Sequence, residues 1–221
     1  MRVDHLFAGG VRFLEPEGQR TGLFKEPRLR VLVTRQGIAG DFQADRRHHG
    51  GAEKAICQYA AANYRRIAAR FAMAAVPKAG SFGENVGASA MDELSVCIGD
   101  RYQVGGAQIE VSQPRTPCWK LNHRFAEREL SRFVLAERIT GWYYRVIGEG
   151  AIAVGDAFSL IARPNPRWTI DRMWRAVNEH RPDPAELREL AGIAGLAPDW
   201  ARRLGERADF LERAAPGTRG A

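Results

Sequence analysis

The cysteine at position 118 stands among residues that favour its ionised form. The stretch QPRTPCWKLN, Gln113 to Asn122, surrounds it with two prolines, a tryptophan and the cations Arg115 and Lys120. Nearby positive charge stabilises a thiolate, which is both a nucleophile and a ligand for thiophilic metals. These residues predict a reactive or metal-binding thiol. The alternative is a buried structural cysteine, which fits Cys57 and Cys97 better because each lies in an apolar stretch.

A second group of residues has the composition of an anion site. The stretch GDFQADRRHHGGAEKAICQY, residues 40–59, contains His49, Gly50, Gly51 and Lys54. A Gly-Gly pair that leads into a helix can present backbone N–H groups to an anion, and the two cationic side chains would add to that charge. The alternative is a turn in which the glycines supply positive φ angles.

Two further stretches allow both a functional and a structural interpretation. In GSFGENV, residues 80–86, Asn85 could contact a ligand and Glu84 lies beside it, or the stretch is only a turn. In GWYYRV, residues 141–146, the aromatic side chains either wall a pocket or fill a core, and we favour the core.

The elements that must position these residues are mainly strands. The stretch 94–114, LSVCIGDRYQVGGAQIEVSQP, predicts three strands separated by a Gly-Asp and a Gly-Gly turn, and residues 142–164 repeat this pattern. Two helices are expected, at about 60–73 and 127–139, from their apolar spacing. Many short strands with tight turns favour a barrel or a sandwich.

The C-terminal quarter of the sequence has a helical pattern instead of a strand pattern. Two prolines in ARPNPRW, residues 162–168, mark a boundary between a β domain at 1–162 and a three-helix domain at 168–215. Thr169 and Asp183 are expected N-caps, and Pro184 suits the first helical position. We expect these helices either to cover the barrel or to mediate self-association, as in a homodimer.

Composition excludes several classes of protein. No apolar run is long enough to span a membrane, and the first residues contain no apolar core of a secretory signal. Three widely spaced cysteines argue against a disulfide framework and favour the reducing cytoplasm. The net charge of +7 is spread along the chain, so we expect no nucleic-acid polymer as a partner. The common zinc, dinucleotide and P-loop motifs are missing from the sequence.

Taken together, four stretches resemble one family. They are GIAGDFQADRRHHGGAEKAICQY, FGENV, IGDRYQVGGAQIEVSQPRTPCWKLN and GWYYRV. In this order they are similar to the MOSC family, the molybdenum cofactor sulfurase C-terminal domain proteins, and above all to its YiiM-like branch. The resemblance covers about residues 3–162. It implies a mainly β, α+β fold with a MOSC-type β-barrel, interspersed helices and a short helical C-terminal domain.

The same resemblance implies a molybdopterin-type cofactor and a role for each candidate residue. Cys118 falls on the position of the cysteine that ligates molybdenum, and the prolines would hold its loop rigid. The cofactor contacts fall on His49, Gly50, Gly51, Lys54 and Arg115 for the phosphate, and on Asn85 and Gln113 for the pterin or the substrate. His49 or Glu84 would donate a proton, and the sequence does not decide between them.

The implied activity is the reduction of N-hydroxylated compounds, such as hydroxylamino purines and amidoximes, by oxygen-atom transfer to the metal. No flavin, haem or iron–sulfur motif is present, so electrons would come from a separate reductase. The main alternative is a sulfur carrier, in which Cys118 bears a persulfide for metal–sulfur centres or cofactor sulfuration. A third alternative is an anion-binding module without catalysis.

Overall fold

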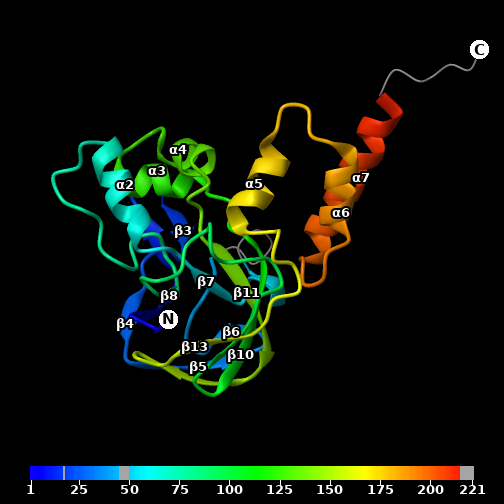
Figure 1. Ribbon diagram of the computed structural model, residues 1–221. Helices are drawn as coiled ribbons and strands as arrows, with labels where there is room; N and C mark the ends of the chain where they lie inside the picture. Colours follow the sequence, from blue (N-terminus) through cyan, green and yellow to red (C-terminus); the bar gives the residue numbers. More distant parts are fainter. Residues whose placement is uncertain (17, 45–49, 215–221) are drawn as a thin grey trace, which may run out of the picture.

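The structure, a computed structural model, describes residues 1–16, 18–44 and 50–214. Its described helices are the single 3-10 turn η1 (Ala52–Lys54) and six α-helices: α2 (Ala62–Arg70), α3 (Trp119–Phe125), α4 (Leu130–Ala136), α5 (Ile170–Asn178), α6 (Pro184–Ala191) and α7 (Pro198–Ala214). Figure 1 shows α2, α3 and α4 gathered at one end of a curled sheet, with α5, α6 and α7 standing beside it.

The curled sheet has eight strands and forms a half-barrel. In spatial order they are β13 (Phe158–Ala162), β9 (Arg101–Val104), β10 (Ala107–Pro114), β11 (Trp142–Gly148), β7 (Ile56–Gln58), β8 (Val86–Gly87), β1 (His5–Ala8) and β4 (Glu26–Arg28). Within this sheet only β7 and β8 pair in parallel. The smaller sheets are β12 (Gly150–Ala153), β5 (Arg30–Thr34) and β6 (Gly37–Ile38), and β2 (Arg12–Leu14) with β3 (Gln19–Thr21). The predicted α+β, mainly β class is confirmed.

Strands β10 and β11 form the centre of the sheet, and their apolar side chains build the core. Ile109 and Val111 of β10 and Trp142, Tyr144 and Val146 of β11 are buried in one hydrophobic cluster. Successive side chains of a strand point to opposite faces, so the residues between them face away from this cluster. Tyr143 therefore lies on the face opposite Trp142 and Tyr144.

The structure corrects three of the expected elements. Residues 94–98 form no strand, and only an isolated bridge joins Cys97 to Thr169. The Gly-Gly pair at 50–51 leads into η1, a single turn, instead of a longer helix. A helix that the apolar spacing did not indicate, α3, begins directly after Cys118.

The three C-terminal helices lie where the sequence predicts them. The Thr169 side chain accepts a hydrogen bond from Arg172 N, and the Asp183 side chain accepts one from Ala185 N, so both predicted N-caps are confirmed. Apolar side chains of these helices belong to the same hydrophobic cluster as the half-barrel. None of the helices in the described residues is long and apolar enough to cross a membrane.

Candidate functional site

A row of three residues runs across the middle of the sheet. Cys57 on β7 is the cross-strand partner of Tyr143 on β11, and Tyr143 is the partner of Gln113 on β10. Directly opposed residues of antiparallel strands point to the same face. Cys57, Tyr143 and Gln113 therefore share the face that lies away from the core.

A β-bulge sets the end of this row. The register between β10 and β11 shifts between Val111 and Gln113, which leaves Ser112 as the extra residue. The Ser112 hydroxyl donates to the carbonyl oxygens of Glu53 at 2.6 Å and Tyr143 at 3.1 Å. Without the bulge, Ser112 would stand opposite Tyr143, so the bulge is what brings Gln113 to this face.

Cys118 follows in the loop after β10. The backbone N–H of Arg115 donates to Gly141 O at 3.0 Å, which ties the start of this loop to the start of β11. Cys118 then takes an extended conformation and precedes the first residue of α3, and its side chain caps no backbone group. Its thiol is half-buried and forms no disulfide.

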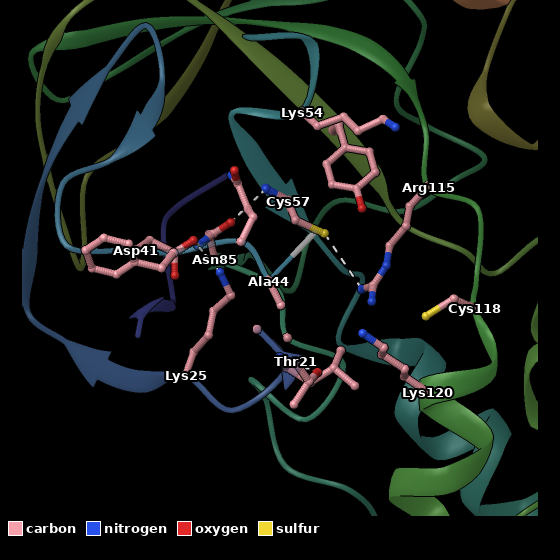
Figure 2. A pocket seen from close by; sticks show the side chains of 16 residues that line it. Thr21, Lys25, Asp41, Ala44, Lys54, Cys57, Asn85, Arg115, Cys118 and Lys120 are labelled. Carbon is pink, nitrogen blue, oxygen red and sulfur yellow. Dashed lines mark hydrogen bonds and ion pairs between the residues drawn. The ribbon is translucent and has the colours of Figure 1, made fainter. Parts of the chain in front are cut away.

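Two hollows meet at Cys118. The inner hollow has about 620 Å³ of empty space and the outer cleft about 1740 Å³, both including open solvent. They share Lys54, Cys118, Lys120 and Tyr143 as lining residues. Figure 2 shows the inner hollow. The described residues that line it include four cations, Lys25, Lys54, Arg115 and Lys120, but only one carboxylate, Asp41. This hollow is therefore suited to an anion.

Arg115 is a buried source of that charge. It is 6% exposed, and its guanidinium donates to Phe82 O at 2.6 Å and to the Cys57 sulfur at 3.7 Å. No carboxylate of the described residues forms an ion pair with it. Burial acts to lower the pKa of Arg115, but electrostatic interactions with the acidic groups around it, including the Glu84 carboxylate, raise it more, so the group stays charged. A buried charge without a directly paired carboxylate favours binding of an anionic ligand.

Cys57 shares the inner hollow with Cys118 but differs in its protonation. Burial raises the pKa of Cys57, and the Arg115 charge opposes that effect without overcoming it. In Figure 2 the Arg115 guanidinium lies between the two sulfur atoms. Since Cys57 remains a neutral thiol, the Arg115 charge is not neutralised by it. The expectation that Cys57 is only a structural cysteine was incomplete, because it also lines the site.

Asn85 joins the inner hollow to the sheet. Its side-chain oxygen accepts from Cys57 N at 3.0 Å, and its amide nitrogen donates to Phe7 O at 3.2 Å and to Asp41 at 2.9 Å. Asp41 also forms a buried ion pair with Lys25. The charge of Lys25 is therefore matched within the protein, in contrast to that of Arg115.

Glu84 lies outside both sets of lining residues. Its carboxylate accepts from the Tyr64 hydroxyl and Gly80 N, both at 2.6 Å, and from Phe82 N at 3.1 Å. These contacts close the loop at 80–84, whose Phe82 carbonyl holds Arg115. The proton-donor role of Glu84 stays a prediction, whereas its position supports Arg115.

The other predicted residues divide between the hollows. Gln113, Lys54 and Gly50 line the outer cleft, and Lys54 also lines the inner hollow. Gly51 lines neither, and it supplies a φ of 94° before η1, as the turn alternative requires. His49 falls outside the described residues. Trp142 and Tyr144 fill the core, as favoured for the stretch 141–146, whereas Tyr143 lines both hollows, as the alternative allowed. Sequence reasoning missed the cavity-lining roles of Cys57 and Lys25, because neither composition nor spacing distinguishes them.

A curled half-barrel with a cation-lined thiol between two hollows defines the class of this protein as a mainly β domain with one accessible cysteine. Residues 45–159 match the family model of the MOSC domain. This match spans more than half of the chain, so the chain belongs to the MOSC domain family, and its relatives place it in the YiiM-like branch. MOSC domains are associated with the molybdenum cofactor.

Three relatives illustrate this placement. Protein YiiM of Escherichia coli K12 is 32% identical over 195 residues, which are 87% of this chain and 86% of that protein. The crystal structure of YiiM from Geobacillus stearothermophilus has a TM-score of 0.79 at 27% identity, with 94% of this chain and 98% of that chain covered. A Gibberella moniliformis protein named Reductase is 38% identical over 150 residues, which are 66% of this chain but only 26% of that longer protein.

Proposed function

We propose that this protein is a molybdenum-cofactor-dependent reductase of N-hydroxylated compounds and that Cys118 is its protein ligand to the metal. The observation that carries the proposal is the buried guanidinium of Arg115 in the hollow that Cys118 borders, which forms no direct ion pair with a carboxylate of the described residues. The family association with the cofactor and the relative named Reductase support a redox activity of this kind.

The described residues fit such a cofactor. A thiolate suits a thiophilic metal, and the cations of the inner hollow suit the anionic groups of a molybdopterin. The Gln113 amide nitrogen is buried without a hydrogen-bond partner among the described residues, so it is a donor available for a ligand. Those residues contain no cluster of three or more His, Cys, Asp or Glu able to hold a metal, so the remaining ligands would come from the cofactor.

The cofactor would supply oxygen-atom transfer when bound, and the chain would supply ligation, charge and access. Arg115 and Lys120 would offset negative charge beside Cys118. Lys54, Gly50 and Gly51 remain proposed phosphate contacts, together with His49, and Asn85 and Gln113 remain proposed contacts to the pterin or substrate. Reduction of a hydroxylamine to an amine consumes two electrons and two protons and releases water. A separate reductase in the cytoplasm would deliver these electrons.

Metal analysis of protein made in a host that synthesises molybdopterin tests this proposal. We expect close to one molybdenum per chain and reduction of a hydroxylamino purine by the wild-type protein. Cys118→Ser should lose both, because the hydroxyl is a poor ligand for a thiophilic metal. Cys97→Ser is the matched control, since Cys97 is buried away from both hollows and its sulfur contacts Pro166 O at 3.6 Å.

The same preparation separates the reductase from the sulfur carrier. Cyanide-labile sulfur on Cys118 without molybdenum would support the carrier and reject the reductase. Full molybdenum content in Cys118→Ser would show that another group binds the metal.

A further inference from the structure

Tyr143 of β11 lines both the inner hollow and the outer cleft. It is 7% exposed, and its pairing with Cys57 and Gln113 places its side chain on the face of the sheet that lies away from the core. Its neighbours on the same strand, Trp142 and Tyr144, belong to the core cluster. The alternation of the strand therefore turns one phenol toward the hollows and the next into the core.

The two phenols differ in their hydrogen bonds. The Tyr144 hydroxyl donates to the Gln58 side-chain oxygen at 2.7 Å. The Tyr143 hydroxyl, in contrast, forms no hydrogen bond with any residue that the structure describes. A nearly buried hydroxyl without a partner in the protein costs free energy that a ligand atom would recover. The Tyr143 hydroxyl is therefore available to an occupant of the hollows.

The surroundings of the Tyr143 hydroxyl favour a negatively charged oxygen atom. A phenol keeps its proton at neutral pH because its ordinary pKa is about 10, and burial raises the pKa of Tyr143 further. The hydroxyl can thus donate a hydrogen bond, and the Arg115 charge acts at the same place. A fixed donor beside a fixed cation stabilises an oxygen that carries or gains negative charge.

Tyr143 also stands beside the proposed metal ligand. The phenol interacts electrostatically with the Cys118 thiol, and both residues line the inner hollow and the outer cleft. Lys120 lines both hollows as well, but its Nζ donates to Arg20 O at 2.6 Å. A ligand atom at the junction of the hollows would therefore meet the thiol and the phenol together.

We propose that Tyr143 is a catalytic residue whose phenol O–H donates a hydrogen bond to the oxygen atom of the substrate N–O bond. This inference rests on the proposed function and deepens it. As the N–O bond breaks, its oxygen gains negative charge, which the Tyr143 hydrogen bond and the Arg115 charge stabilise. Tyr143 keeps its proton throughout, so the two electrons still come from the separate reductase and the two protons from solvent.

Binding of inorganic phosphate to the metal-free full chain tests the donor without catalysis, because phosphate presents charged oxygen atoms. We expect Tyr143→Phe to raise the Kd for phosphate, measured by calorimetry, about tenfold or more. Its melting temperature should stay unchanged, since the variant loses no hydrogen bond to a described residue. Equal phosphate affinity in Tyr143→Phe and the wild type, or no phosphate binding to the wild type, would overturn the proposal.

Tyr144→Phe is the matched control. It should lower the melting temperature, because the bond to Gln58 is lost, and leave the phosphate affinity unchanged, because Tyr144 lies in the core. The two variants thus separate a binding role from a structural one. A loss of phosphate affinity as large in Tyr144→Phe as in Tyr143→Phe would overturn the proposal.

Turnover supplies the second readout. In molybdenum-loaded protein, Tyr143→Phe should lower kcat for a hydroxylamino purine about a hundredfold and change KM by less than about threefold, with molybdenum content unchanged. An unchanged kcat, or a loss of kcat only in proportion to lost molybdenum, would overturn the proposal. If the wild type reduces no hydroxylamino purine but phosphate affinity still depends on Tyr143, the donor assignment stands and the reductase fails.

Discussion

Cys57 and Cys118 line the same hollow, yet their surroundings give them different chemistry. Cys57 is 6% exposed, and burial raises its pKa, so it stays protonated near neutral pH. Cys118 is half-buried and borders both hollows, so ligands and reagents reach it from the outer cleft. Access and burial, rather than residue type, separate the two thiols.

We therefore expect iodoacetamide to modify Cys118 of the metal-free protein at least about tenfold faster than Cys57 near neutral pH. Peptide mass spectrometry at successive times measures both rates. Cys118→Ala should remove the fast phase, and Cys97→Ala should leave it unchanged. Equal rates at Cys57 and Cys118 would contradict the burial difference.

Glu93 is a buried carboxylate that joins three elements. It accepts hydrogen bonds from the Asn63 amide on α2 at 2.9 Å and from Gly141 N, next to β11, at 2.8 Å, while its carbonyl accepts from Asp171 N on α5. Burial raises the pKa of Glu93 more than these donors lower it. The protonated form is therefore favoured in the folded state, and stability is lost as the pH rises through the raised pKa.

The free energy of unfolding of Glu93→Gln, minus that of the wild type, should accordingly increase as the pH rises from about 4.5 to about 8. The variant has no carboxyl group at this position to ionise. The expected increase is about 1.4 kcal/mol for each unit by which folding raises the pKa. Urea unfolding at both pH values measures it. Glu137→Gln is the control, because Glu137 forms an exposed ion pair with Arg66 and should show no such trend. A constant difference would show that Glu93 titrates normally.

At the scale of elements, the close pairing of β7 with β11 positions the face of the sheet that bears Cys57 and Tyr143. Gly141, just before β11, has a φ of 74°, and a Cβ atom there would lie 2.3 Å from Gln58 O on β7. Only glycine permits this approach, which brings Cys57 and Tyr143 into one row. A larger residue would have to push the two strands apart.

Gly141→Ala should lower the free energy of unfolding by at least about 2 kcal/mol and reduce molybdenum content. Gly155→Ala is a matched control, since its φ is 92° but a Cβ atom would meet nothing within 4 Å. It should cost only about 1 kcal/mol and leave metal content unchanged. Thermal unfolding with metal analysis compares the two. Equal losses in the free energy of unfolding would show that the close approach of Gly141 to β7 does not determine the effect of the substitution.

At the scale of the molecule, the C-terminal helices and the half-barrel share one hydrophobic cluster. Ile170, Met173 and Leu187 of the helices belong to the cluster that contains Ile109 and Val111 of the sheet. The Trp174 indole also donates to the Thr140 hydroxyl at 2.8 Å, and Arg138 pairs with Asp171. The two parts therefore stabilise each other.

We expect the full chain to unfold in one cooperative transition. A fragment ending at residue 167 should be insoluble or melt at least about 10 °C lower, because it exposes the face that the helices cover. Calorimetry and sedimentation compare the two proteins. A fragment with the melting temperature of the full chain would instead support an independent helical domain at 168–215.

Local sequence determined several features of this protein. The N-caps Thr169 and Asp183 and the Gly-containing turns were predictable because each depends on neighbouring residues alone. The loop around Cys118 was also recognisable, since its prolines, cations and thiol lie within a few positions.

Only the tertiary structure decided which distant residues meet at that loop. Cys57, Tyr143 and Gln113 form a row through strand pairing, and a bulge at Ser112 selects which side chain faces the site. The start of α7 lines the outer cleft, and the Ala197 N–H just before it donates to Ser112 O of the same bulge. Periodicity within a segment predicts its own conformation, whereas register, bulges and packing arise between segments far apart in the chain and leave no local pattern.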